Sequence, residues 1–118
     1  MTIQNAIASL AVKDLAKAVE YYRKLFGRPA DSTPMPEVAE WKFERGGWLQ
    51  VYQLEERAGS GSVTLAVSNL EDQMADLRRI AIDPGKPMIS EKVKVVMIKD
   101  PDGNSIAFAE AIDRSMAR

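Results

Sequence analysis

The sequence predicts an α+β fold made of two copies of one unit, in which a strand is followed by a helix and then by two or three further strands. The main observation is an internal repeat, because the pattern of residues 7–25 recurs at residues 62–80, at a constant offset of 55 residues. In both copies the apolar residues alternate with the period of a strand and then recur with the period of a helix. The duplication predicts two similar halves, with a ligand bound where they meet.

The first half begins with a predicted strand over residues 6–12, in which larger apolar side chains alternate with smaller ones. Asp14 is placed to cap a helix over about 15–26, where apolar residues recur every three or four positions. Gly27 predicts the end of that helix, because glycine readily adopts the left-handed conformation of a helix C-cap.

Prolines at 29, 34 and 36 indicate that residues 28–37 form a loop with at most a short edge strand. Two strands, over about 38–45 and 48–54, are predicted to form a hairpin around Gly46-Gly47. Residues 55–61 are rich in glycine and polar residues, which favours a link between the halves.

The second half repeats this order. A strand with apolar Val63, Leu65 and Val67 leads to Asn69, the expected cap of a helix over about 70–81. A short strand near 88–90 and a hairpin over 92–99 and 104–110 follow, and Asp100-Pro101-Asp102-Gly103 is interpreted as the turn of that hairpin rather than as a cation site. We therefore expect one domain over 1–118, with modules at 3–56 and 57–112 and a polar tail at 113–118.

Composition excludes several kinds of function. The 16 basic and 17 acidic residues give a net charge of −1, which favours neither nucleic acid nor a membrane surface as a partner. The chain has no cysteine and no histidine, so thiolate sites, imidazole-bound metals and histidine-dependent triads are excluded. No apolar stretch approaches the length of a membrane span, and we expect a soluble cytoplasmic protein.

Strand alternation indicates which side chains a ligand would meet. If the helices cover the larger apolar positions of each first strand, the opposite faces carry small residues, such as Ser9 and Thr64. The hairpin adds either Trp48, Gln50 and Tyr52, which we favour, or the alternating set beginning at Leu49. The aromatic residues of this hairpin are equally compatible with an ordinary core. The orientation of Glu40 and of the acidic residues in the preceding loop is not fixed by the sequence.

Two stretches resemble the vicinal oxygen chelate superfamily, which includes glyoxalase I, extradiol dioxygenases and bleomycin-resistance binding proteins. They are Val12–Gly27, with the pattern Val-x-Asp-Leu-x-x-Ala-x-x-Tyr-Tyr-x-x-Leu-Phe-Gly, and Asp100–Ile106, with Asp-Pro-Asp-Gly-Asn-x-Ile. The resemblance spans about residues 3–110. It implies two βαβββ modules that form a cupped mixed sheet with helices on its outer face, usually in a dimer.

The resemblance also implies where a metal would be held, on the first and last strands of each module. Carried over by spacing from the two matching stretches and the Gly46-Gly47 turn, these positions are Ile7, Gln50, Ser62 and Ala107. Two of them have no donor atom and the other two are weak neutral ligands. The sequence therefore predicts no metal site, no cofactor and no metal-dependent glyoxalase or dioxygenase activity.

We therefore expect a metal-independent small-molecule binding protein of glyoxalase/bleomycin-resistance type that acts as a homodimer. We expect it to sequester a hydrophobic or aromatic compound between its modules and so to contribute to antibiotic resistance. The predicted ligand-binding residues are Ile7, Ser9, Trp41, Trp48, Gln50, Tyr52, Ser62, Thr64 and Ala107. No catalytic residue is predicted. The alternatives are a metal-independent isomerase or lyase that uses a carboxylate or Tyr52, and a structural or partner-binding module whose cavity is closed.

Overall fold

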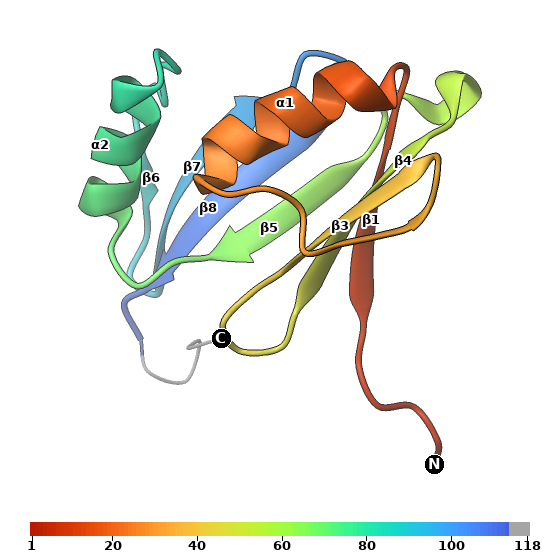
Figure 1. The fold of residues 1–118 in the computed structure, drawn as a ribbon. Coiled ribbons are helices and arrows are strands. Elements are labelled where there is room, and N and C mark those ends of the chain that lie inside the picture. The colour runs from red at the N-terminus through yellow and green to blue at the C-terminus, as the bar shows by residue number, and fades with distance from the viewer. Residues whose placement is uncertain (114–118) are drawn as a thin grey trace. The chain divides into compact units, whose positions relative to one another are not determined.

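A computed structural model describes residues 1–113 of the chain. Figure 1 traces a strand, a helix and three strands, and then the same order again. The chain divides into two compact units, the first made of residues 1–61 and 101–104, the second of 62–100 and the residues from 105 onward. The α+β fold class is confirmed, while the single domain and its module limits stay predictions. Most of the predicted 113–118 tail lies outside the described residues.

The first unit contains one helix and a four-stranded sheet with strand order β1-β4-β3-β2. Its elements are β1 (Ile7–Val12), α1 (Leu15–Phe26), β2 (Ser32–Met35), β3 (Val38–Lys42), β4 (Trp48–Gln53) and the short 3₁₀ helix η1 (Glu55–Arg57). β1 runs parallel to β4, and the other neighbours are antiparallel.

The second unit repeats this topology with strand order β5-β8-β7-β6. Its elements are β5 (Ser62–Ala66), α2 (Leu70–Arg79), β6 (Met88–Ile89), β7 (Val93–Lys99) and β8 (Ser105–Ala111). β5 is parallel to β8, so the sequence repeat corresponds to a repeat of strand pairing.

The helix N-termini are capped in the same way in both units. The Asp14 side chain accepts a hydrogen bond from the Lys17 N–H, and Asn69 does so from Asp72, as the sequence predicted. In each unit a side chain from the last strand adds a second cap by accepting a hydrogen bond from the first N–H of the helix. Gln53 of β4 does so for α1 at 2.9 Å, and Glu110 of β8 does so for α2 at 2.7 Å. These contacts fix each helix against the sheet strand that ends beneath it.

Aromatic rings fill the space between α1 and its sheet. Tyr22 and Phe26 of the helix meet Trp41 at centroid distances of 6.0 and 5.7 Å, and Phe26 also contacts Phe43. Tyr22 and Trp41 are fully buried. Edge-to-face and tilted ring pairs of this kind stabilise a core beyond their burial alone. One face of the sheet is thus covered by α1, and by alternation the other face carries no helix of this unit.

Residues 101–104 belong to the first unit although they lie in the turn that joins β7 and β8. The fully buried Asn104 donates a hydrogen bond to the Ala11 carbonyl at 2.8 Å and accepts one from the Gly61 N–H at 2.9 Å. Gly59 lies against this turn with φ 86°, and a Cβ there would be 2.1 Å from the Asp102 carbonyl oxygen. The turn interpretation of Asp100–Gly103 is confirmed, and its close approach requires glycine at position 59.

Two element ends differ from the sequence expectation. β3 ends at Lys42 rather than near Arg45, because the Phe43 N–H donates to the Gly47 carbonyl and closes the hairpin turn early. α2 ends at Arg79, because Ala81 takes a positive φ of 64°. Neither helix in residues 1–113 has the length and apolar character that a membrane crossing requires.

Candidate functional site

The face of the first sheet opposite α1 is built from cross-strand rows of side chains. Strand pairing places Ile7, Trp48 and Lys42 in one row and Ser9, Gln50 and Glu40 in the next. A third row contains Ala11, Tyr52 and Val38. Seven residues of these rows define the surface that we call the helix-free face. They are Ile7, Ser9, Glu40, Lys42, Trp48, Gln50 and Tyr52.

The register favoured from the sequence is confirmed, because Trp48, Gln50 and Tyr52 share a face with Ile7 and Ser9. Their neighbours in β4, Leu49 and Val51, are fully buried on the side of α1. Trp48, Gln50 and Tyr52 are half-buried, and Ile7 is 54% exposed.

A chain of hydrogen bonds crosses the middle row. The Ser9 hydroxyl donates to Gln50 Oε1 at 3.3 Å, and Gln50 Nε2 donates to Glu40 Oε2 at 3.0 Å. Three strands, β1, β4 and β3, each supply one of these side chains. The amide of Gln50 is therefore held in one orientation, with its NH₂ group turned toward the carboxylate.

The neighbouring row combines an aromatic ring with a cation. Lys42 Nζ lies 5.9 Å from the centroid of the Trp48 ring, within the range of a cation–π contact. The indole of Trp48 is half-buried, so part of its surface remains accessible. An accessible ring beside a polar row is suited to a planar ligand that also makes hydrogen bonds.

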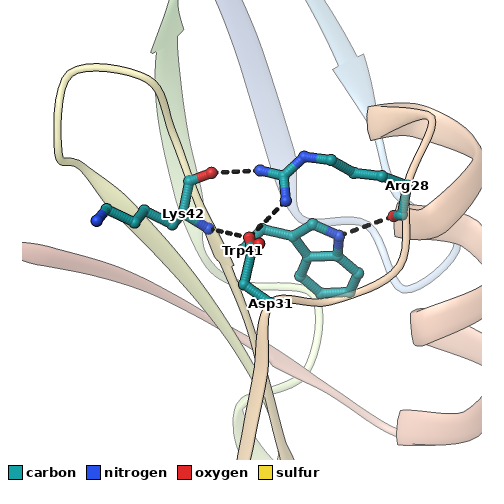
Figure 2. Close-up of polar contacts among 4 residues, drawn as sticks. All are labelled: Arg28, Asp31, Trp41 and Lys42. Carbon is teal, nitrogen blue, oxygen red and sulfur yellow. Dashed lines mark hydrogen bonds and ion pairs between the residues drawn. The ribbon is translucent and has the colours of Figure 1, made fainter.

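Trp41 does not join this face, which corrects its predicted place among the ligand-binding residues. It pairs with Leu49 on the covered side of the sheet, where it is 0% exposed. Figure 2 shows its indole Nε1 donating a hydrogen bond to the Arg28 carbonyl, at 3.1 Å. A ligand could reach this ring only if the core opened, so Trp41 is a core residue.

A polar cluster at the outer edge of β3 supports the helix-free face from the side (Figure 2). The Asp31 carboxylate accepts hydrogen bonds from the Lys42 N–H at 2.7 Å and from Arg28 at 2.5 Å, and Arg28 also donates to the Lys42 carbonyl. Both bonds lower the pKa of Asp31 from its usual 3.8, and the bond from the Lys42 N–H has the larger effect. The bonds to the Lys42 backbone hold the end of β3 beyond its last pair with β2, Ser32 with Glu40. They therefore help to keep the side chains of Glu40 and Lys42 on the helix-free face.

The corresponding face of the second unit is simpler. Ser62 and Thr64 are exposed on β5, and Thr64 pairs with Ala107, which in turn pairs with Met97. Ala107 is only 7% exposed because it is a small side chain between two larger ones. Contact of Ser62, Thr64 and Ala107 with a ligand stays a prediction.

The residues at the four positions where the resemblance implies metal ligands do not fit a divalent metal. Ile7 and Ala107 have no donor atom, and Ser62 offers only a hydroxyl. The amide oxygen of Gln50 is already used by Ser9. Within residues 1–113, no group of three or more acidic side chains is arranged to hold a metal ion.

Sequence reasoning missed Glu40 and Lys42 as members of this face. Both alternate with Trp41 in β3, so assigning Trp41 to the core would have turned them to the opposite side. The signal was present in the alternation, but the sequence did not show which side of the strand α1 covers.

No family model and no curated protein matches the chain. Among solved structures, it resembles a glyoxalase/bleomycin resistance protein from Catenulispora acidiphila, with 31% identity, TM-score 0.82, and coverage of 92% of this chain and 98% of that one.

Two further similar structures share the fold at lower identity. One is an antibiotic binding protein from a Streptomyces species, with 20% identity, TM-score 0.77, and coverage of 94% and 98%. The other is a lactoylglutathione lyase from Agrobacterium tumefaciens, with 19% identity, TM-score 0.74, and coverage of 93% and 94%. Taken with the repeated strand–helix–strand units and the near-complete match at 31% identity, these comparisons show that the chain belongs to the glyoxalase/bleomycin resistance protein family of the vicinal oxygen chelate superfamily.

Proposed function

We propose that the protein binds a small aromatic molecule on the helix-free face of its first unit, without a metal ion. The observation that carries the proposal is the half-buried ring of Trp48 beside the hydrogen-bonded row of Ser9, Gln50 and Glu40. An aromatic surface with a few oriented polar groups is the usual composition of a small-molecule site.

The family context supports binding in preference to metal-dependent chemistry. A protein of the same fold is described as an antibiotic binding protein, so this architecture can bind a small molecule. The four positions that would hold a metal carry residues unsuited to it. A homodimer in the cytoplasm stays a prediction of the sequence.

Equilibrium dialysis against 1-naphthylmethanol in the presence of EDTA tests this function. We expect saturable binding by the wild-type protein and a loss of at least about fivefold in affinity in Trp48→Ala, since stacked aromatic contacts contribute roughly 1 kcal/mol or more. Tyr21→Ala is the matched control, because it removes a half-buried ring from α1. Equal binding by wild type and Trp48→Ala would refute the proposal.

A metal-independent isomerase or lyase is the second candidate, and the observation that favours it is Glu40. This carboxylate shares the helix-free face with Tyr52, so an acid/base group and a hydroxyl lie on adjacent strands. In that case Glu40→Gln would abolish conversion of a substrate, although the variant would still bind neutral 1-naphthylmethanol.

A further inference from the structure

We propose that Glu40 makes the helix-free face selective for aromatic ligands that carry a protonated amine. The inference rests on the proposed binding function and adds to it the chemical class of the ligand. It follows from the hydrogen bond between Glu40 and Gln50, from the lack of a cation beside Glu40 in residues 1–113, and from the position of Glu40 relative to Trp48.

Glu40 lies on an inner strand of the sheet. β3 runs between β4 and β2, and Glu40 pairs with Gln50 on one side and with Ser32 on the other. The side chain is half-buried. A charge in this position is less screened by water than one on an exposed loop, so an opposite charge on a ligand would be attracted more strongly.

Glu40 has no protein cation as its partner within residues 1–113. Other carboxylates there do form ion pairs, among them Glu20, Asp31, Glu55, Glu71 and Asp76. The hydrogen bond that Glu40 accepts comes from the neutral amide of Gln50. A carboxylate has about four acceptor positions, so most of its capacity is left for a further donor.

The ring of Trp48 lies within reach of this carboxylate. Glu40 is directly opposite Gln50, and Trp48 is two residues before Gln50 on the same face of β4. Such diagonal neighbours are about 7–8 Å apart, a distance that a substituted aromatic molecule can span. A ring stacked on Trp48 can therefore direct an aminomethyl group toward Glu40.

Lys42 is the charge that opposes this selectivity. It lies two residues from Glu40 on the same face, but its side chain is exposed and its ammonium group is over the Trp48 ring. Water screens an exposed ammonium more than a half-buried carboxylate. Its position also indicates that the ring accepts a cation, so a ligand amine could replace it there.

Three matched probes test the inference by equilibrium dialysis at pH 7 with EDTA: 1-naphthylmethylamine, 1-naphthylmethanol and 1-naphthylacetate. We expect the amine to bind at least about tenfold more tightly than the alcohol, since both can donate a hydrogen bond to the Glu40 carboxylate but only the amine adds the attraction of an opposite charge. The acetate should bind most weakly. Raising the salt concentration should weaken the binding of the amine and leave that of the alcohol nearly unchanged.

Glu40→Gln should remove the preference, so that the amine binds to this variant no more tightly than the alcohol does. Glu37→Gln, which neutralises an exposed carboxylate just before β3, is the matched control and should keep the preference. If the wild type binds amine and alcohol equally, or if Glu40→Gln keeps the preference, the inference is wrong while the binding function stands. If no probe binds, both are wrong. The salt series on the wild type keeps the test decisive should Glu40→Gln fail to fold.

Discussion

Gln50 Nε2 donates a hydrogen bond of 3.0 Å to Glu40 Oε2, across the pairing of β4 with β3. Gln50 occupies one of the positions where metal-binding members of the superfamily are expected to supply a ligand. Here the same position orients an amide between a serine and a carboxylate. The sheet that would hold an ion instead presents a fixed row of donors and acceptors next to an aromatic ring.

The first expected outcome concerns metal. Purified protein incubated with Zn²⁺ or Ni²⁺ and then desalted should retain less than about 0.1 ion per chain, because neutral oxygen donors without imidazole or carboxylate ligands bind these ions weakly. Elemental analysis measures this directly. One retained ion per chain would show that the protein has a metal site away from the four positions that the superfamily resemblance implies.

Asn104 should be among the most sensitive positions for stability. Asn104→Ala removes one buried and one partly buried hydrogen bond and leaves the Ala11 carbonyl and the Gly61 N–H without this partner, so we expect a loss of about 3 kcal/mol in the free energy of unfolding. Urea denaturation gives this value. Asn5→Ala removes an exposed side-chain bond to the Gly46 carbonyl and should cost less than about 0.5 kcal/mol. Similar losses in the two variants would contradict the proposed importance of the Asn104 contacts.

Gly59 and Gly47 form a matched pair of glycines. Gly59→Ala would introduce a Cβ 2.1 Å from the Asp102 carbonyl oxygen at a positive φ, so it should destabilise the fold by more than about 2 kcal/mol. Gly47→Ala places its Cβ in open space and should change stability by less than about 1 kcal/mol. Thermal or urea denaturation distinguishes the two. A tolerated alanine at position 59 would mean that the turn at 100–104 does not pack here as described.

The edge cluster around Asp31 predicts a dependence of stability on pH. The hydrogen bonds from Lys42 and Arg28 lower the pKa of Asp31 in the folded state below its usual 3.8. Its contribution is therefore complete above about pH 4 and is lost as the pH falls through the folded-state pKa. Asp31→Asn should be less stable than wild type at pH 7, and the difference should shrink below pH 4. Glu44→Gln, in the neighbouring turn, controls for loss of an exposed charge. A difference that stays constant from pH 7 to pH 2 would show that the carboxylate's charge is not what stabilises the edge of β3.

Local patterns made much of the fold predictable. The caps at Asp14 and Asn69 and the stop at Gly27 depend on neighbouring residues only, and the structure has them where the sequence placed them. Alternation divided β4 into two possible faces, and parallel pairing of Ser9 with Gln50 puts the favoured one beside Ser9.

Contacts between distant parts of the chain were not predictable. From the sequence Asn104 is expected only to follow a turn. Nothing near it in the sequence indicates its hydrogen bond to the carbonyl of Ala11, 93 positions away. Trp41 and Trp48 are both hairpin aromatics, and only the position of α1 decides that one is core and the other partly accessible. Glu40 entered the candidate site for the same reason.

The two tryptophans provide the most direct measurement of binding on the helix-free face. In a ¹⁵N-labelled sample the indole N–H groups of Trp41 and Trp48 give two signals, which the variant Trp48→Phe assigns. On titration with 1-naphthylmethanol in EDTA we expect a saturable shift of the Trp48 signal, while that of Trp41, buried and bonded to the Arg28 carbonyl, stays in place. A Trp48 signal that does not move at saturating probe, or one that moves no more than that of Trp41, would contradict ligand binding on this face.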